Sequence, residues 1–441
     1  MAIDTLQRDR RYNADADGDG EWFEAVHLIH QRMLQEMDLK AVERLDTARA
    51  REAVTVAARQ LVTQELPSLL GDDRERVIRR VIDEAIGFGP IEPLIADDTI
   101  SEIMVNAPEE IFFERDGVLY LSPLRFKDAQ HIMRIVERII APLGRRVDES
   151  SPYVDARLPD GSRVNVVIPP LVPRSPTMTI RKFRREKYKI ADLIANGTMT
   201  ASMAEFLRIC VRQRLNIVIS GGTGTGKTTL LNALSAHIPD GERIIAIEDP
   251  IEMKMQQSHA ISMEARPANI EGKNEVTQRD LVRNALRMRP DRIIIGEVRG
   301  AEAFDMLQAM NTGHEGSLTT IHANSPRDAL IRIENMVMMA GFDLPVRAIR
   351  EQICSALHVV VQIARFSDGR RRIKQVTEIT GHEGDTITTH DLFVFRQHGT
   401  TPEGHVIGEL EPTGIVPTFA DDFAMSGINL AMMGLGLDGL R

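Results

Sequence analysis

Residues 216–235 read NIVISGGTGTGKTTLLNALS, and this stretch decides the fold of the second half of the chain. The apolar run from Asn216 to Ser220 predicts a strand, and the segment after the glycines predicts a helix. Between them, residues 221–228 match the phosphate-loop pattern GxxxxGK(S/T) in full. A glycine-rich turn with a chance Lys-Thr pair would not join a strand to a helix in this way. A nucleotide-binding loop is therefore the better interpretation.

Each residue type in this loop has a physical task. Glycines let backbone N–H groups approach the phosphates, and the N-terminus of the following helix adds a positive dipole end. Lys227 supplies a point charge for the β- and γ-phosphates, and the Thr228 hydroxyl is placed to ligate Mg²⁺. The expected ligands are ATP and Mg²⁺. The residues expected to hold them are Gly221, Gly222, Thr223, Gly224, Thr225, Gly226, Lys227, Thr228 and Thr229.

Two acidic clusters end apolar runs downstream of the loop. Residues 243–252 read RIIAIEDPIE, and residues 291–299 read DRIIIGEVR. Ligands of open α/β sheets bind at the carboxyl ends of the strands, where both clusters are expected. Hydrolysis needs one group that orients water and a carboxylate near Mg²⁺. We assign Glu248 to the water and Glu297 to Mg²⁺, with the two roles exchangeable; a solvated turn carboxylate is the alternative for each.

A third polar cluster, residues 313–325, reads GHEGSLTTIHANS. Thr319, His322 and Asn324 fall close to the end of a short predicted strand. A neutral His322 would sense the γ-phosphate by hydrogen bonding. The alternative is a histidine with a purely structural role, and the crowding of polar residues leaves both readings open.

Composition argues against a nucleic-acid-binding, secreted or membrane-spanning protein. The chain has 441 residues, 43% of them hydrophobic and 27% charged, as in ordinary globular proteins, and a net charge of −10 that argues against general nucleic-acid binding. Cys210 and Cys354 lie among apolar residues and are expected to be buried free thiols. The first residues lack the apolar core of a signal peptide, and no uncharged apolar run approaches about 20 residues. We therefore expect a cytoplasmic protein that reaches the membrane only through partners.

Patterning divides the chain into six parts. We expect a disordered tail over 1–25, a helical bundle over 26–94, a mixed α/β domain over 95–190, a linker over 191–204, a parallel α/β domain over 205–425 and a flexible tail over 426–441. Asp15, Asp17 and Asp19 imitate the start of a calcium loop. Val26 stands where that loop needs a bidentate Glu, so we favour a polar tail.

Together these motifs resemble the secretion ATPase superfamily of type II secretion, type IV pili and type IV secretion. GGTGTGKTT resembles its Walker A motif, IEDPIE its acidic box and HEGSLTTIHANS its His box. RPDRIIIGEVRG resembles its unusual Walker B motif, with Gly296 where most P-loop proteins carry Asp. In RecA-like members of the superfamily the catalytic glutamate lies on the strand after the P-loop helix, which favours Glu248 as the base.

Residues 85 to 425 look most like the tight-adherence (Tad) pilus branch, the CpaF-type motor ATPases. The segments that carry this resemblance are 87–119, 145–171 and TIRKF at 179–183, and the zinc-binding CxxC pairs of many type II secretion ATPases are absent. The resemblance implies an α/β fold in which a helical bundle and a PAS-like domain precede a RecA-like ATPase domain. It also implies a homohexamer that binds ATP between domains and acts on inner-membrane pilus platform proteins, without nucleic acid or direct membrane insertion.

A ring interface has a chemical use, because an arginine from another domain or subunit can neutralise charge that builds on the γ-phosphate. The resemblance places such arginines near the end of the N-terminal domain, and a basic strand end that faces solvent is the alternative. The nearest matches are Arg181 and Arg184; weaker candidates are Arg157, Arg163, Arg287 and Arg299.

The leading hypothesis is a hexameric motor that converts ATP hydrolysis into domain rotation for assembly and retraction of a tight-adherence pilus. A type IV secretion ATPase that moves protein or DNA is the first alternative. A second is a nucleotide-binding assembly switch without useful turnover. A RecA-type nucleic-acid motor is the third, and the lack of an aromatic and basic stretch speaks against it.

Overall fold

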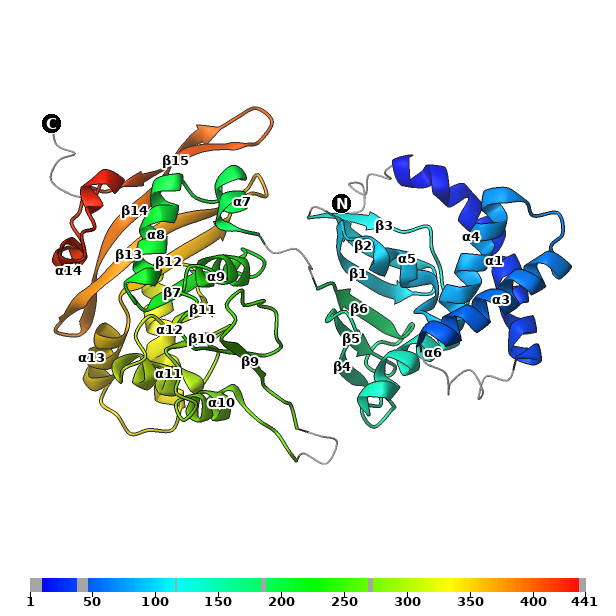
Figure 1. Cartoon of the computed structure of the whole chain (residues 1–441), viewed down its shortest axis with the longest axis horizontal. Coiled ribbons are helices and arrows are strands. Elements are labelled where there is room, and N and C mark those ends of the chain that lie inside the picture. Colours follow the sequence, from blue (N-terminus) through cyan, green and yellow to red (C-terminus); the bar gives the residue numbers. More distant parts are fainter. Residues whose placement is uncertain (1–9, 38–46, 116, 184–187, 269–272, 436–441) are drawn as a thin grey trace. The chain divides into compact units, whose positions relative to one another are not determined.

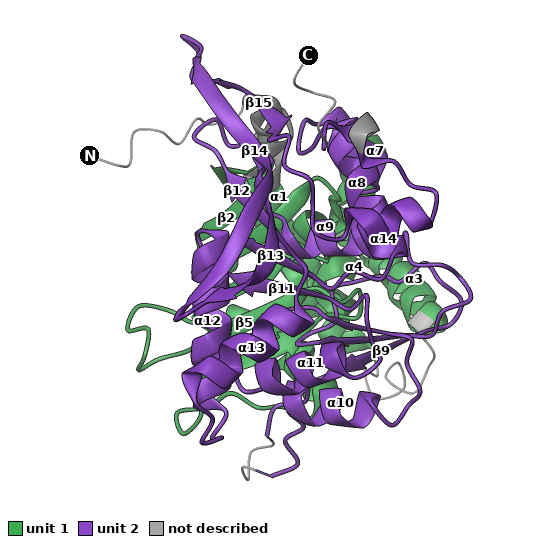
Figure 2. Cartoon of the chain, turned by 90° about the vertical axis from the view of Figure 1, so that its left-hand side faces the viewer, with its two compact units in different colours: residues 1–185 green, residues 186–441 purple. Residues whose placement is uncertain are grey.

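The computed structural model describes residues 10–37, 47–115, 117–183, 188–268 and 273–435. The chain divides into two compact units, Met1–Arg185 and Glu186–Arg441 (Figure 2), close to the boundary expected after residue 190. Both units contain helices and sheets, so the predicted α/β fold is confirmed (Figure 1). None of the helices in the described ranges has both the length and the apolar composition needed to span a membrane.

Unit 1 begins with three packed helices, α1 (Arg10–Glu36), α3 (Thr47–Glu65) and α4 (Gly71–Ile86). Buried residues of α4 lie three or four positions apart, at Val77, Ile78, Val81 and Ile82, and so share one face of the helix. This face packs against apolar residues of α1 and α3, which completes a small core.

The predicted tail is wrong for the residues that the structure describes, because α1 begins at Arg10 and contains Asp15, Asp17 and Asp19. The physical reason lies further along the helix. Trp22 and Val26 continue the helical spacing of the buried residues Ile29 and Met33 and pack on the same core. The amphipathic pattern therefore starts before residue 26, and the helix extends back from it.

The rest of unit 1 is an antiparallel sheet covered by a helix. Its strands lie in the order β3-β2-β1-β6-β5-β4. Apolar residues of α6, among them Ile132, Ile135 and Val136, pack on one face of this sheet. The elements are η1 (Gly89–Ile91), α5 (Glu92–Ala96), β1 (Ile100–Ala107), β2 (Glu110–Arg115), β3 (Val118–Leu121), α6 (Ala129–Ile140), η2 (Ala141–Leu143), β4 (Tyr153–Arg157), β5 (Arg163–Val167) and β6 (Thr177–Arg181).

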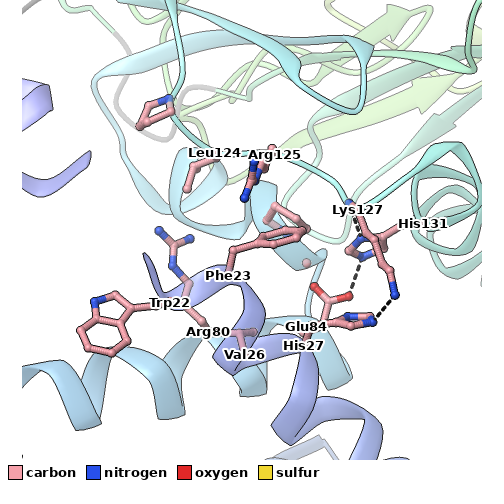
Figure 3. A pocket seen from close by; sticks show the side chains of 13 residues that line it. Trp22, Phe23, Val26, His27, Arg80, Glu84, Leu124, Arg125, Lys127 and His131 are labelled. Carbon is pink, nitrogen blue, oxygen red and sulfur yellow. Dashed lines mark hydrogen bonds and ion pairs between the residues drawn. The ribbon is translucent and has the colours of Figure 1, made fainter. Parts of the chain in front are cut away.

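Polar contacts join the helices to the sheet part of unit 1 (Figure 3). His131 Nε2 on α6 lies 2.5 Å from Glu84 Oε1 on α4, and Lys127 Nζ lies 2.5 Å from His27 Nε2 on α1. The guanidinium of Arg125 covers the ring of Phe23 at 4.5 Å. These residues surround a cavity of about 70 Å³, room for a few water molecules. We therefore interpret it as an imperfection of packing rather than a ligand site.

The described residues of unit 2 form a nine-stranded sheet in the order β15-β14-β13-β12-β7-β11-β10-β8-β9. The strands from β12 to β9 are parallel, and β13, β14 and β15 extend the sheet as antiparallel hairpins. The strands are β7 (Ile217–Gly221), β8 (Ile244–Glu248), β9 (Ala260–Glu264), β10 (Arg292–Ile295), β11 (Leu318–His322), β12 (Val359–Arg365), β13 (Arg371–Glu383), β14 (Thr386–Thr400) and β15 (Val406–Pro412).

Helices cover both faces of this sheet, and each face has its own apolar core. Every residue of β7, β8 and β10 is buried as a result, which explains why these strands read as continuous apolar runs. The helices are α7 (Ile190–Ala195), α8 (Ala201–Arg212), α9 (Lys227–Ser235), α10 (Gln278–Ala285), α11 (Glu302–Asn311), α12 (Pro326–Met339), α13 (Val346–Ala356), α14 (Ala420–Met425) and η3 (Leu430–Met433).

Two boundaries differ from those expected. Residues 191–204, expected as a linker, contain most of α7 and the start of α8, and Leu193 and Met203 are buried in the core. Residues 426–435, expected within a flexible tail, include η3, and Leu430 and Leu435 are buried in the same core. Apolar side chains find a surface in both segments, and that burial orders the chain. The remainder of the expected tail, 436–441, lies outside the described residues.

Candidate nucleotide site

The phosphate loop lies at the carboxyl end of β7, between the neighbouring strands β11 and β12. Gly224 and Gly226 have φ of 69° and 96°, in the left-handed region that favours glycine. At Gly221 a Cβ atom would lie 2.5 Å from the carbonyl oxygen of Ile363 on β12. Glycine is therefore required both by the backbone conformation of the loop and by its close approach to the next strand.

A chain of charged and polar groups runs from the loop to the second acidic cluster. Lys227 Nζ donates to the carbonyl oxygen of Gly222 at 2.9 Å and lies 3.1 Å from His322 Nε2. The same His322 nitrogen lies 3.2 Å from Glu297 Oε1. Arg299 donates to Glu297 Oε2 through Nε at 2.9 Å and through Nη2 at 2.6 Å. The structure thus brings the phosphate loop, the second acidic cluster and the third polar cluster together at one edge of the sheet.

The surroundings of His322 favour its neutral form. Burial, followed by the charge of Lys227, lowers the pKa of His322 below its usual 6.5. A neutral Nε2 either accepts a hydrogen bond from the Lys227 ammonium or donates one to Glu297, but one nitrogen cannot do both. A γ-phosphate that binds Lys227 would therefore leave His322 free to donate, which is the chemistry of a phosphate sensor.

Glu248 lies at the end of β8 and is only 2% exposed. Its Oε1 accepts hydrogen bonds from the backbone N–H groups of Glu252 at 3.0 Å and Met253 at 3.1 Å. The side chain packs against Gly296, where a Cβ atom would lie 2.8 Å from Glu248 Cγ. The glycine at the usual Asp position of the Walker B motif therefore makes room for Glu248.

Threonine hydroxyls also lie in and just after the loop. Thr228 and Thr229 lie in the first turn of α9, and the hydroxyl of Thr225 donates to the Gly222 carbonyl oxygen at 2.9 Å. Mg²⁺ prefers oxygen ligands and usually takes one or two from protein and the rest from phosphates and water. The hydroxyl of Thr228 and the carboxylate of Glu297 are of this type, so these residues fit the group that the sequence predicts.

Other predicted residues are not gathered here. Thr319 is buried within β11, and Asn324 is exposed beyond its end. Arg287 is exposed just after α10. Arg181 lies in unit 1, where its Nε is 3.8 Å from Glu102 Oε1, and Arg184 lies outside the described residues.

The weaker candidates in unit 1 have an arrangement that the sequence did not predict. In the registers of four neighbouring strands, Arg157 lies opposite Arg163, Arg163 lies opposite Arg181, and Arg181 lies opposite Glu102. Directly opposed residues in an antiparallel sheet point to the same side. Three arginines therefore form one basic row on the sheet face opposite to α6.

Sequence reasoning missed Arg371. This arginine begins β13, and its Nε donates to the carbonyl oxygen of Gly224 in the phosphate loop at 2.8 Å. The only sequence signal was the run Arg370, Arg371 and Arg372, and nothing in it showed which arginine faces the loop.

Comparison with known proteins supports the reading of these motifs. The family model "Type II/IV secretion system protein" matches residues 84–401. A Mycobacterium tuberculosis protein named for conjugal transfer is 38% identical over 323 residues, which cover 72% of this chain and 91% of that protein. Conjugal transfer protein TrbB of Rhizobium radiobacter is 35% identical over 300 residues, 66% of this chain and 88% of that protein.

Among solved structures, the VirB11 ATPase from the Brucella suis type IV secretion system, in complex with sulphate, is 30% identical and covers 65% of this chain and 94% of that chain, with a TM-score of 0.36. The family match spans well over half of the chain, and the phosphate loop, both acidic clusters and the His box all lie within it. The chain belongs to the type II/IV secretion system protein family.

Proposed function

We propose that this chain is a P-loop ATPase that drives a secretion or pilus machine as a ring-forming motor. The observation that carries the proposal is the meeting of the phosphate loop, the Lys227–His322–Glu297 chain and the buried Glu248 at the carboxyl edge of one parallel sheet. Nucleotide binding alone needs only the loop. Hydrolysis also needs a group that orients water and a carboxylate near Mg²⁺, and Glu248 and Glu297 are of the right type.

The residues divide the work as follows in this proposal. The loop amides and Lys227 would bind the phosphates, and Thr228 and Glu297 would hold Mg²⁺, which would neutralise charge that develops on the phosphates. Glu248 polarises the attacking water, which requires its carboxylate to exchange at least one backbone N–H bond for that water. Once Lys227 has exchanged its contact with His322 for the γ-phosphate, His322 is able to sense that phosphate.

The basic row of unit 1 supplies the missing positive charge. Arg181, and with it Arg157 and Arg163, would neutralise the γ-phosphate of a site completed by another domain or subunit, as in a hexamer. Arg184 is a second candidate from the adjoining segment. Unit 1 would act as the PAS-like domain of such a subunit, and movement of the two units on hydrolysis would be the power stroke.

The machine that we favour is a tight-adherence pilus, worked from the cytoplasmic side through platform proteins of the inner membrane. Residues 87–119 and 145–171 support this choice by their resemblance to that branch. A type IV secretion ATPase is the second candidate, and the relatives named for conjugal transfer favour it. Deleting the gene in its host and counting surface pili and transconjugants would separate the two, since each candidate predicts the loss of one and not the other.

The ATPase proposal is tested by turnover measured against protein concentration, with mass photometry on the same samples. We expect turnover to rise with the population of rings, and Lys227→Ala to abolish it. Arg181→Ala should still assemble but lose turnover by about 100-fold or more, because a charge that acts on the transition state is removed. Arg134→Ala, an exposed arginine on α6, is the matched control and should change nothing. Full turnover by a monomer would refute the ring, and no turnover in any sample would leave a nucleotide switch.

A further inference from the structure

We propose that Arg371 is a positioning residue of the nucleotide site, supplied in the same subunit by the hairpin between β12 and β13. Through its contact with Gly224 it holds the phosphate loop in the shape that receives phosphates, and its charge lies beside them. This inference rests on the proposed function, because it concerns the same site. It adds a residue that lies outside all of the nucleotide motifs identified in the sequence.

The hairpin that carries Arg371 is rigidly built. Arg372 donates to both oxygens of Asp368, at 3.2 and 2.8 Å, and its guanidinium lies over the rings of Phe366 and Phe395 at 5.2 and 5.7 Å. Burial acts to raise the pKa of Asp368, but the bonds from Arg372 and from backbone N–H groups outweigh it and lower the pKa to about 2. The base of Arg371 is therefore fixed before any nucleotide binds.

The stem of Arg371 lies along the phosphate loop. A Cβ atom at Gly226 would lie 3.6 Å from Arg371 Cδ, and β12 runs parallel to β7 with Ile363 opposite Gly221. A larger residue at either glycine would meet β12 or the arginine. Arg371 is itself exposed, and its stem follows the loop to the carbonyl oxygen of Gly224.

The contact with Gly224 has a consequence for anion binding. A phosphate loop binds through N–H groups that point inward, and a carbonyl oxygen turned the same way would repel the phosphates. Arg371 engages the Gly224 carbonyl from the hairpin side, so it keeps that oxygen occupied away from the phosphates.

Arg370 offers a matched control in the same hairpin. It is exposed, it precedes Arg371 directly, and its side chain makes no hydrogen bond or ion pair with another described residue. Arg370→Gln and Arg371→Gln make the same chemical change one residue apart. A general effect of basic charge on nucleotide affinity would appear in both variants, whereas a positioning role would appear in the second alone.

The test is the binding of AMP, ADP and ATP to the full chain, measured by calorimetry for wild type and both variants. We expect Arg371→Gln to weaken ADP and ATP binding by about 10-fold, because a charged hydrogen bond and a nearby charge are lost. AMP binding should change by less than about twofold, since AMP does not engage the whole loop. Arg370→Gln should stay within about twofold for all three nucleotides, and Arg371→Lys should recover part of the lost affinity.

Unchanged ADP affinity in Arg371→Gln, or an equal loss in Arg370→Gln, would overturn the inference. If wild type binds no nucleotide and equals Lys227→Ala, the proposed function itself fails and Arg371 is not the cause. If Arg371→Gln melts early, Arg371→Met, which keeps the apolar stem, takes its place with the same expected 10-fold loss, about one decade in Kd.

Discussion

Gly296 shows how one residue fits a site to its chemistry. Glu248 is buried between backbone N–H donors and the bare face of this glycine, and any side chain there would collide with Glu248 Cγ. The backbone of Gly296 is not in the left-handed region, so glycine is needed for space and not for conformation. The missing Asp of the Walker B motif is therefore part of how the Glu248 carboxylate is positioned.

Gly296→Ala tests this account of Glu248. The added methyl group must displace the carboxylate, so we expect kcat to fall by about 100-fold, on the scale of a lost catalytic base, with ADP affinity nearly unchanged. Steady-state turnover and ADP calorimetry measure the two quantities. Gly300→Ala is the control, because its Cβ atom would meet nothing closer than Glu302 Oε2 at 3.4 Å, and it should keep its activity. Full activity in Gly296→Ala would show that Glu248 is not the base, or that its present position is not the active one.

At this scale, the sequence predicted site residues that lie within one contiguous motif, but it did not predict contacts between residues far apart in the chain. The loop glycines, Lys227 and the strand-end carboxylates follow from local pattern and from the rule that parallel strands end at one edge. The bond from Arg371 to Gly224 joins residues 147 apart, and no periodicity in the sequence encodes it. The packing of Glu248 against Gly296 likewise depends on β8 and β10, which are neighbours in the sheet.

At the scale of elements, α4 carries an acidic residue on its buried face. Asp83 is 7% exposed, and burial, with the nearby charge of Glu92, raises its pKa to about 6. Because this exceeds the 3.8 of an ordinary Asp, the folded state binds the proton more tightly. The stabilisation from this extra protonation is full below pH 3.8 and is lost as the pH rises through about 6.

Asp83→Asn should therefore stabilise unit 1 above pH 7, by on the order of 2 kcal/mol, since the variant no longer buries a charge. The advantage should shrink as the pH falls from 7 to 5. Differential scanning calorimetry of the full chain at both pH values measures it. Asp73→Asn, the same change at an exposed position of α4, should not stabilise at either pH. An advantage of Asp83→Asn that does not depend on pH would contradict the assignment.

The predicted boundaries of elements were wrong where burial in the tertiary structure outweighed local composition. The sequence predicted a mixed α/β domain over 95–190, and the structure has strands β1, β5 and β6 and helix α6 there. It did not predict the first turns of α1, nor that the segment around η3 is folded. Both segments are mostly polar or glycine-rich, so their few apolar residues gave only a weak pattern. Those few side chains find a core only once the fold exists, as Leu435 does.

At the scale of the whole molecule, the proposed function needs residues from two separate units of the chain. The phosphate loop, Glu248 and Glu297 belong to unit 2, and the basic row that includes Arg181 belongs to unit 1. A site completed between subunits of a ring is heterologous, so each subunit gives one half to a neighbour and takes the other half from the next. In the proposed ring, hydrolysis would therefore depend on assembly.

Complementation between two inactive variants tests this central claim most directly. Arg181→Ala lacks one half of the proposed site and Glu248→Gln lacks the other, so neither should turn over ATP alone. Mixed in equal amounts and reassembled, they should recover about a quarter of wild-type turnover, because random mixing completes one interface in four. The mixture of Lys227→Ala with Glu248→Gln, both in unit 2, should recover nothing and serves as the control. If the first mixture also stays inactive although mixed rings form, Arg181 does not complete a neighbour's site and the account is contradicted.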